Sequence, residues 1–292
     1  MYVVDNMLNL FSLSMAFTLI GLNVYLTTKV LNITDLTCDA SVSLGGCAYG
    51  VLVLSGINPL IAFILAACLG ILAGFMTSSF VSHINVDPVL SSIITLTALQ
   101  TFIIKLSHLG KIGLAKKEES PLSVLSALDN SLLVGVIVVF ICFIFYKMLR
   151  SEYGLAMRVY GGGRIISESL GINSNQMLWI GLGAGNALSA VAGALMVQIS
   201  GSFCATIGNG SLVFGLAAVI IGEKILAPVS IRGAIVGCFL GSLAYKVMLE
   251  LATFGGTETF GSEYNNITTA VVLIFLMALI QDSKRKTTLE NI

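Results

Sequence analysis

The chain has 292 residues, of which 56% are hydrophobic and 10% are charged, and its mean hydropathy is +0.96. Soluble domains carry roughly a quarter charged residues, so this composition excludes an ordinary soluble protein and indicates a protein embedded in a lipid bilayer. The formal net charge is zero, and nucleic acid is excluded as a partner because binding it needs a basic surface.

A bilayer core about 30 Å thick needs about 20 apolar residues per helix. Open sheet edges cannot satisfy their amides in lipid, and the apolar stretches lack the alternation of barrel strands, so helices are required. The predicted fold class is an all-α polytopic membrane helix bundle, a single transmembrane domain over 1–292. We predict nine spans, within a range of 8 to 10, at 8–29, 40–56, 59–81, 88–107, 125–149, 176–199, 211–227, 231–252 and 265–281.

The first apolar stretch has no basic flank, because the first cation of the chain is Lys29. We therefore expect a retained span and not a cleaved leader. If the chain crosses the membrane nine times, ten Lys and Arg residues lie on one side. Four lie on the other side, in or next to the 108–124 loop: Lys105, Lys111, Lys116 and Lys117. An excess of Lys and Arg marks the cytoplasmic side. The prediction is N-terminus out and C-terminus cytoplasmic. The ten are Lys29, Lys147, Arg150, Arg158, Arg164, Lys224, Arg232, Lys284, Arg285 and Lys286.

Small residues recur at spacings that bring helices into close contact. Glycines four apart occur at Gly70 and Gly74, at Gly181 and Gly185, and in the series Gly233, Gly237 and Gly241. The sequence around Gly45 also resembles that around Gly215, and Gly70 resembles Gly241 at nearly the same offset. In the predicted topology the two halves run in opposite directions, so an inverted repeat of the transporter type is possible.

Three consecutive glycines, Gly161 to Gly163, stand in the predicted cytoplasmic loop at about 150–175. A phosphate-binding loop is disfavoured, because no strand precedes them and no Gly-Lys-Ser/Thr follows. At helical spacing Ile165, Ile166 and Leu170 share one side, opposite Arg164, Ser167 and Glu168, and Gly171 is a natural stop. The segment is predicted to be a short amphipathic helix, which could alternatively rest on lipid headgroups.

Polar side chains within the spans are few, and they are costly enough to favour a functional role. The candidates are Asp39, Thr95, Gln100, Asn186, Gln198 and Glu223. No nucleophile with a neighbouring base and no metal-ligating cluster is present, so no catalytic residue, metal site or enzyme is predicted. The six cysteines have no Cys-x-x-Cys pair or His at ligand spacing and are interpreted as small buried hydrophobic residues.

Several blocks carry a family resemblance. They are GLAMRVYG at 154–161, LGIN at 170–173, GNALSAVAGAL at 185–195, DLTCDASVSLG at 35–45, ITLTA at 94–98 and GLAAVIIGE at 215–223. Together they span about residues 16 to 280. The chain resembles the permease subunits of bacterial ABC importers of the branched-chain amino acid and ribose class, nearest to a branch of putative aromatic amino acid or uncharacterised permeases.

The resemblance implies a type II importer-like fold in a bacterial inner membrane, with alternating access for a small polar solute such as an amino acid. It implies a cytoplasmic ATPase subunit, a second permease copy and an extracytoplasmic binding protein as partners. ATP and magnesium would lie on the ATPase, with no cofactor in this chain. The six intramembrane polar residues would line the path or its gates. Coupling to the ATPase would fall to Arg158, Gly161, Gly162, Gly163, Arg164, Glu168, Leu170 and Gly171.

One departure concerns the glycines, because acidic or amide residues usually occupy the places of Gly162 and Gly163. It puts in doubt how rigidly the coupling segment is held.

Two other classes of function stay open. An ion-coupled secondary transporter shares inverted repeats and would be stopped by an uncoupler at constant ATP, whereas a non-transport scaffold would give no solute flux with any partner. Few buried charges argue against a metal ion as cargo.

Overall fold

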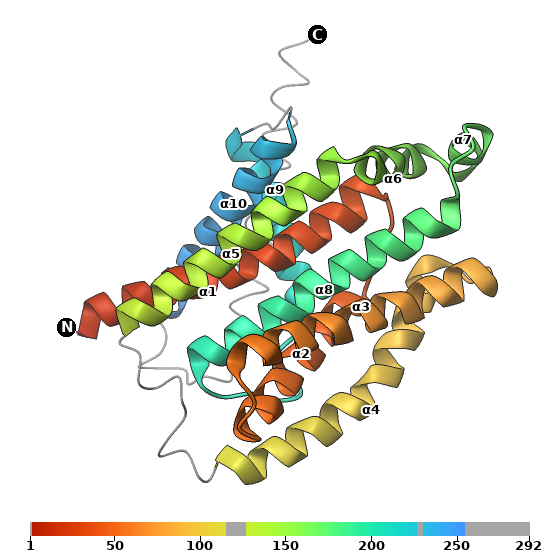
Figure 1. The fold of residues 1–292 in the computed structure, drawn as a ribbon. Coiled ribbons are helices and arrows are strands. Elements are labelled where there is room, and N and C mark those ends of the chain that lie inside the picture. The colour runs from red at the N-terminus through yellow and green to blue at the C-terminus, as the bar shows by residue number, and fades with distance from the viewer. Residues whose placement is uncertain (1, 115–126, 227–229, 255–292) are drawn as a thin grey trace. The chain divides into compact units, whose positions relative to one another are not determined.

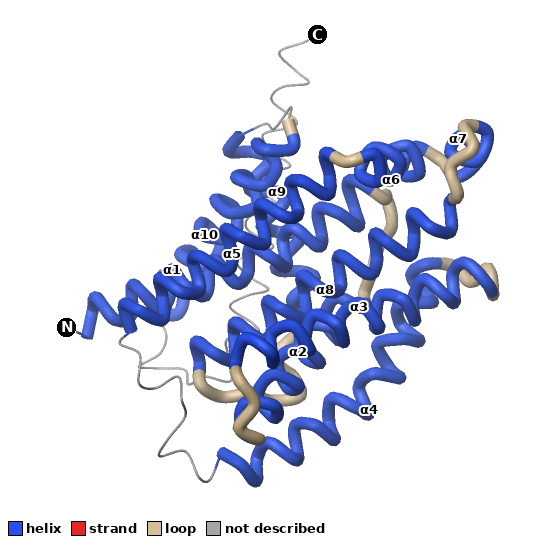
Figure 2. Tube along the Cα trace, in the orientation of Figure 1, coloured by secondary structure: helices blue, strands red, loops and turns tan. Residues whose placement is uncertain are grey.

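A computed structural model of the chain describes residues 2–114, 127–226 and 230–254. Every regular element in these ranges is a helix (Figures 1 and 2), which confirms the all-α prediction. The elements are α1 (Tyr2–Tyr25), the π-helix η1 (Leu26–Val30), α2 (Thr37–Leu54), α3 (Pro59–His83), α4 (Pro88–Leu114), α5 (Ala127–Arg150), α6 (Glu152–Gly162), α7 (Arg164–Ser169), α8 (Ser174–Ser200), α9 (Ser211–Leu226) and α10 (Ile231–Phe254).

Within the described ranges, seven segments are long and apolar enough to cross a bilayer. Each corresponds to a predicted span, and the chain is a multi-pass membrane protein. The predicted span at 265–281 lies outside the described residues. The seven are Leu8–Val30, Thr37–Leu54, Pro59–His83, Pro88–His108, Leu132–Arg150, Ser174–Ser200 and Ile231–Glu250.

α9 differs from the full span predicted over 211–227. It has 16 residues, about 24 Å at 1.5 Å per residue, which is shorter than a bilayer core of about 30 Å. Its first turn also lies inside the bundle, because Phe214 stacks on Phe17 of α1 with ring centroids 4.0 Å apart. Phe17 is about midway along the Leu8–Val30 span. α9 therefore begins within the bundle, and nine spans are not reached among the described residues.

Residues 1–243 form one compact unit, and residues 244–292 form a second. The first unit holds α1 to α9 and the first half of α10. Of the second unit, the structure describes the remainder of α10, which continues as one helix across the boundary.

The helices of the first unit pack as two groups that run in opposite directions. α2 packs parallel to α8, because Ser41 contacts Asn186 and the later Tyr49 contacts the later Gln198. α3 packs antiparallel to α8, because Gly70 lies against Asn186 and the later Gly74 against the earlier Leu182. α1 holds α9 parallel and the start of α10 antiparallel, through Phe17 with Phe214 and Ser14 with Ser242. This arrangement agrees with an internal repeat in which α8–α10 correspond to α1–α3. α2 and α3 of the first repeat pack on α8, and α9 and the start of α10 of the second repeat pack on α1.

Small residues make this close packing possible. A side chain at Gly45 would meet the backbone of Ala190, and side chains at Gly70 and Gly74 would meet the backbone of α8. Helices can approach in lipid by van der Waals packing only where such residues leave room. The predicted glycine pairs therefore lie at helix contacts. Gly181 and Gly185 lie against the side chains of Leu31 and Asn23, and Gly237 and Gly241 lie against the backbone of α9.

Short polar signals set where the helices begin. Asn58 accepts from the Leu60 N–H at 3.0 Å, and Asp87 accepts from the Val89 N–H at 2.9 Å, each just before a proline. A side-chain cap satisfies an orphan N–H, and proline at the first helical position has none to satisfy. Asn173 caps α8 through the Gln176 N–H at 3.2 Å. These boundaries can be read from the sequence.

All six cysteines are free thiols. Three of them, Cys38, Cys47 and Cys238, are buried as the sequence predicts, whereas Cys68 and Cys204 are exposed. The prediction that all six are buried is therefore wrong. Cys68 lies on α3, within a span whose surface is largely uncovered by other helices, so it remains in an apolar stretch.

Candidate functional site

The glycine triplet joins two helices. α6 (Glu152–Gly162) contains Gly161 and Gly162, and Gly163 separates it from α7 (Arg164–Ser169) with φ 148°. Side chains rarely adopt this φ, so glycine is required at 163. The sequence predicted one helix after the glycines and missed α6, which contains two of them. The predicted stop is confirmed, because Gly171 follows α7 with φ 76°.

α7 turns its apolar side chains away from the rest of the described chain. Ile165 is 84% exposed, Ile166 55% and Leu170 65%. We call these three residues the α7 apolar face. The opposite side faces inward, where the buried Ser167 hydroxyl lies 2.8 Å from the Ser174 hydroxyl of α8. Ser167 is therefore the buried position of α7, and the described residues leave the α7 apolar face largely exposed.

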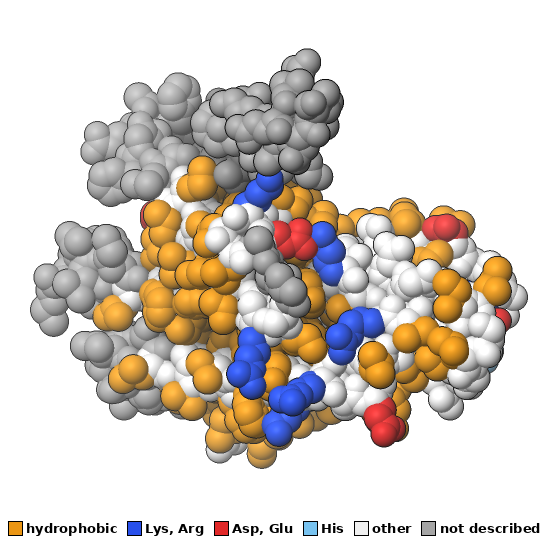
Figure 3. Space-filling model, turned by 90° about the horizontal axis from the view of Figure 1, so that it is seen from above, with side chains coloured by type: hydrophobic (Ala, Val, Ile, Leu, Met, Phe, Trp, Pro, Cys, Tyr) orange, Lys and Arg blue, Asp and Glu red, His pale blue; other side chains and the backbone are white. Residues whose placement is uncertain are grey.

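The charged residues of α7 pair with each other. Arg164 Nε lies 2.8 Å from Glu168 Oε1, and both side chains are about half exposed. The Arg164 guanidinium lowers the pKa of the Glu168 carboxyl, which is therefore ionised at neutral pH. Figure 3 shows several Lys and Arg side chains on the face of the molecule that is seen from above.

Two contacts fix α6 against the bundle. A side chain at Gly161 would meet the carbonyl oxygen of Val30, so α6 crosses the end of η1 at the closest possible approach. Next to it, Tyr160 and Ile33 pack on a buried cluster of Val81, Leu178 and Leu182. Gly162 differs from Gly161, because a side chain there would meet open space. The segment is thus held tightly at Gly161 although the usual polar residues are absent.

Arg158 joins α6 to the end of α5. Its guanidinium donates to the Leu149 carbonyl at 2.9 Å and to the Gly154 carbonyl at 3.2 Å. These bonds satisfy backbone oxygens where α5 ends. The structure therefore places Arg158 on α6, with its guanidinium beside the α5–α6 junction.

A polar cluster lies inside the bundle, at Asn186 near the middle of α8. Asn186 Nδ2 donates to Asp35 Oδ2 at 2.8 Å, and its Oδ1 accepts from the Ser41 hydroxyl at 2.6 Å. The other oxygen of Asp35 accepts from the Thr37 N–H at 2.8 Å, which caps α2. Thr37 in turn lies 2.7 Å from the Thr77 hydroxyl of α3. One network therefore joins the start of α2, the C-terminal part of α3 and the middle of α8 to segment 31–36.

The polar cluster has a second branch toward α1. Asn23 Nδ2 donates to the Ser189 hydroxyl at 2.6 Å, and that hydroxyl lies 3.2 Å from Cys38 Sγ. Asn23 is 1% exposed, and its Oδ1 has no hydrogen-bond partner among the described residues. A buried unsatisfied oxygen costs about 1–3 kcal/mol. The sequence analysis missed Asp35 and Asn23 as site residues, because their partners are more than 150 positions away.

The other predicted path residues have separate settings. Asp39 caps the start of α9 by accepting from the Gly210 and Leu212 N–H groups at 3.1 and 2.7 Å. Gln198 accepts from the Tyr49 hydroxyl at 3.1 Å, and Glu223 lies 2.8 Å from Lys29 at the end of α9. Thr95 donates to the Ser91 carbonyl of its own helix, and Gln100 is half-buried on α4.

Asn186 and Gln198 thus lie at the α2–α8 contact, Asp39 joins α2 to the start of α9, and Glu223 joins α9 to η1. Thr95 and Gln100 lie on α4. Among the described residues, no group of three or more His, Cys, Asp or Glu side chains could hold a metal ion. The chemistry available here is polar contact within an apolar bundle.

Comparison with known proteins places these features in a family. Residues 6–280 match the family described as "Branched-chain amino acid transport system / permease component". The chain is 28% identical over 268 residues to the tyrosine transport system permease protein of Clostridioides difficile, covering 90% of this chain and 88% of that protein. It is 23% identical over 291 residues to the ribose import permease protein RbsC of Escherichia coli, covering 98% and 88%.

A solved structure shares the fold. The structure is PsaBC from Streptococcus pneumoniae in complex with Fab, with a TM-score of 0.51 and 13% sequence identity. The similarity covers 92% of this chain and 88% of that chain.

Proposed function

The chain belongs to the permease component family of branched-chain amino acid transport systems, and from this premise we propose that it forms the membrane path of an ATP-driven importer for an amino acid. The family makes it a transport subunit of the ABC type. Similarity to a tyrosine transport permease supports an amino acid as cargo. The narrower parts of the proposal concern the partners, the coupling segment and the path.

The α7 apolar face is the observation that carries the coupling proposal. Exposed large apolar side chains outside the spans are costly unless a partner covers them. Ile165, Ile166 and Leu170 lie beyond the ends of α5 and α8, at the end of the bundle where α6 and α7 lie (Figure 1). We propose that a cleft on a separate ATPase subunit receives this face, with Arg164 and Glu168 at its rim. ATP and magnesium would be bound on that subunit.

Movement of α7 has a short route to the interior. α6 follows directly from α5 and touches η1 through Gly161 and Val30. Segment 31–36 comes next, with Ile33 in the same cluster as Tyr160 and Asp35 bound to Asn186. η1 is a π-helix, and such turns are frequent at functional sites. ATPase closure would therefore shift α6, move segment 31–36 and rearrange the polar cluster.

Alternating access would follow as a rigid-body change between the two helix groups. The polar cluster around Asn186 lies about 18 Å along α8 from Ser174, which places it deep in the bundle. It offers hydroxyl, amide and carboxyl groups to a polar solute if the helices separate. Asp39, Thr95, Gln100, Gln198 and Glu223 would line the path or its gates.

The complete importer would contain two permease copies, two ATPases and an extracytoplasmic binding protein in a bacterial inner membrane. The α6–α7 end would face the cytoplasm, with the N-terminus out. These assignments rest on the family and on the cations that gather on the face of Figure 3.

Co-purification tests the coupling proposal. The tagged chain, solubilised from membranes of its own host, is expected to retain an ATPase, and Leu170→Asp or Glu168→Arg is expected to weaken retention at least tenfold. Ile84→Asp is the matched control, because Ile84 is 62% exposed in the connection between α3 and α4. Equal retention in all variants would refute α7 as the docking segment.

Uptake assays separate the rival classes. An uncoupler that abolishes uptake while ATP is constant would favour an ion-coupled transporter. Absence of flux with all partners present would favour a scaffold. ATP-dependent transport by this chain alone would contradict the need for a separate ATPase.

A further inference from the structure

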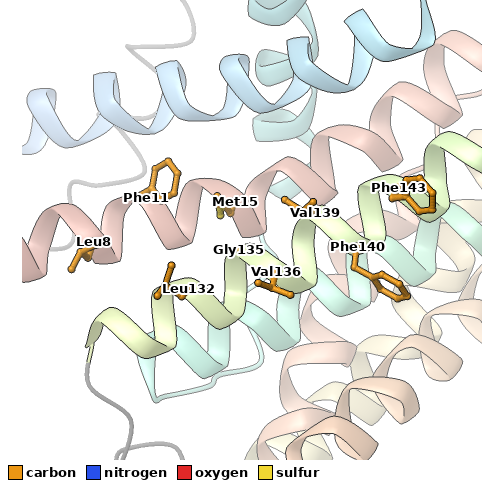
Figure 4. Close-up of a pocket in the computed structure, with 9 residues that line it drawn as sticks. All are labelled: Leu8, Phe11, Met15, Leu132, Gly135, Val136, Val139, Phe140 and Phe143. Atoms are coloured by element: carbon orange, nitrogen blue, oxygen red, sulfur yellow. The ribbon is translucent and has the colours of Figure 1, made fainter.

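An apolar groove runs between α1 and α5 on the surface of the bundle (Figure 4). Both walls belong to spans, Leu8–Val30 and Leu132–Arg150. Val136 is 71% exposed and Phe140 64%, so the described helices leave the α5 wall uncovered. The lining residues are Leu8, Phe11, Met15, Leu132, Gly135, Val136, Val139, Phe140 and Phe143.

Three cations stand at one end of this groove. The helical face of α5 that carries Val139 and Phe143 continues to Tyr146, Lys147 and Arg150. Tyr146 OH accepts from Arg150 Nη1 at 3.1 Å and from Arg232 Nε of α10 at 3.0 Å. The Arg232 guanidinium also lies 5.3 Å from the centre of the Tyr146 ring. Lys147, Arg150 and Arg232 are termed the cationic cluster below.

The cationic cluster and the groove are contiguous. Lys147 Nζ lies 5.6 Å from the ring centre of Phe143, which lines the groove. Tyr146 orients two of the three cations, because both arginines donate to its hydroxyl. Tyrosine is typical of the membrane–water interface, where its ring meets lipid and its hydroxyl meets polar groups.

The cationic cluster has no described carboxylate to neutralise it. Ion pairs in the described ranges include those of Lys29 with Glu223 and of Arg164 with Glu168, and neither involves the cationic cluster. Glu152 follows Arg150 closely in sequence but forms no ion pair with it in those ranges. Three positive charges beside an apolar groove, two of them oriented by Tyr146, favour an anion that also carries an apolar part.

The dimensions fit a phospholipid. From Val136 to Arg150 α5 is about 21 Å long, which matches one leaflet together with its headgroup region, about 20–22 Å. Val136, Val139, Phe140 and Phe143 then lie at the depth of the acyl chains, and Tyr146 to Arg150 lie at the depth of the headgroups. An acyl chain along the groove would therefore present its phosphate to the cationic cluster.

We infer that the α1–α5 groove and the cationic cluster form a binding site for an anionic phospholipid. One acyl chain lies on Val136, Val139 and Phe140, and the phosphate lies between Arg150 and Arg232. The bound lipid joins α5 to the start of α10 on the α6–α7 side of the membrane. The site is separate from the α7 apolar face, so it can exist whether or not the transport proposal holds.

Lipid binding to the purified, delipidated chain tests the inference by native mass spectrometry. Dioleoyl phosphatidylglycerol is expected to bind at least tenfold more tightly than dioleoyl phosphatidylcholine, which has the same chains. Each cation near a membrane surface contributes about fivefold in affinity, so Arg150→Gln is expected to weaken phosphatidylglycerol about fivefold. Lys105→Gln removes one exposed cation from α4 and is expected to change nothing.

The groove is tested separately from the charge. Val136→Trp fills it and is expected to weaken both lipids at least tenfold, whereas Ile144→Trp places the same ring on an exposed α5 position outside it. Variants are compared only where helix content by circular dichroism equals that of the parent. Val139→Gln, which introduces a side chain smaller than tryptophan, supplies a second groove variant if Val136→Trp fails this criterion.

Several results would each overturn the inference. They are equal binding of the two lipids, equal losses in Arg150→Gln and Lys105→Gln, unchanged binding in the groove variants, and displacement of the lipid by millimolar inorganic phosphate alone. Lipid binding restricted to the monomer and lost on dimer formation would assign the groove to a second copy and overturn it equally.

Discussion

Alanine substitutions along the glycine triplet should have three different outcomes. Gly161→Ala places a methyl group against the Val30 carbonyl, a backbone atom that cannot rotate away. Forcing an extra carbon into such a contact costs about 1–3 kcal/mol. Gly162→Ala enters open space and gains up to about 0.5–1 kcal/mol in helix propensity. Gly163→Ala strains a φ of 148°, which costs about 1–3 kcal/mol.

Amide hydrogen exchange of residues 152–171, followed by mass spectrometry, measures these differences locally. A loss of 1–3 kcal/mol corresponds to about 5- to 150-fold faster exchange when opening is local. Exchange should accelerate in Gly161→Ala and Gly163→Ala, and it should stay equal or become slower in Gly162→Ala. Identical exchange in Gly161→Ala and Gly162→Ala would refute the tight contact between α6 and η1.

Three further substitutions test other contacts by the thermal denaturation midpoint in detergent. Asp39→Ala removes the cap of α9 and should destabilise the chain by about 0.5–2 kcal/mol. Glu152→Ala is the control, and equal denaturation midpoints of the two variants would contradict the cap. Asn186→Leu leaves Asp35 and Ser41 without their partner, at about 1–3 kcal/mol for each group, and an unchanged midpoint would exclude the network. Glu223→Gln should cost less than about 1 kcal/mol, because its pair with Lys29 is about half exposed; a larger loss would show a more buried role.

The sequence predicts well those elements whose signals are local. α3 and α8 were expected at 59–81 and 176–199 and are observed at Pro59–His83 and Ser174–Ser200. Long apolar stretches fix such helices, and Asn58 and Asn173 mark their starts. The stop at Gly171 was likewise predictable, because a positive φ after a helix favours glycine.

Elements that depend on distant residues were not predictable in the same way. α6 contains Gly154, Gly161 and Gly162, and glycine lowers helix propensity. Its stability comes from contacts with η1 and α8. α9 is as apolar as a full span, and its start inside the bundle is set by Asp39, more than 170 positions earlier in the chain.

The polar cluster shows the same limit. Asn186 was identified from the cost of an amide inside a span, but its partner Asp35 was interpreted only as part of a resemblance block before α2. Asp35 and Asn186 are 151 positions apart, and no short-range pattern joins them. The path residues Thr95 and Gln100 stay predictions, since their contacts on α4 reveal no role in transport.

Amino acid uptake into proteoliposomes tests the central claim most directly. The chain is reconstituted with the ATPase that co-purifies with it and with its binding protein, and uptake of a mixture of radiolabelled amino acids is measured with ATP supplied to the ATPase side. We predict uptake that requires ATP and the ATPase and that falls at least tenfold in Leu170→Asp, while Ile84→Asp transports normally. Uptake that persists without the ATPase, or that is equal in the two variants, would contradict the account.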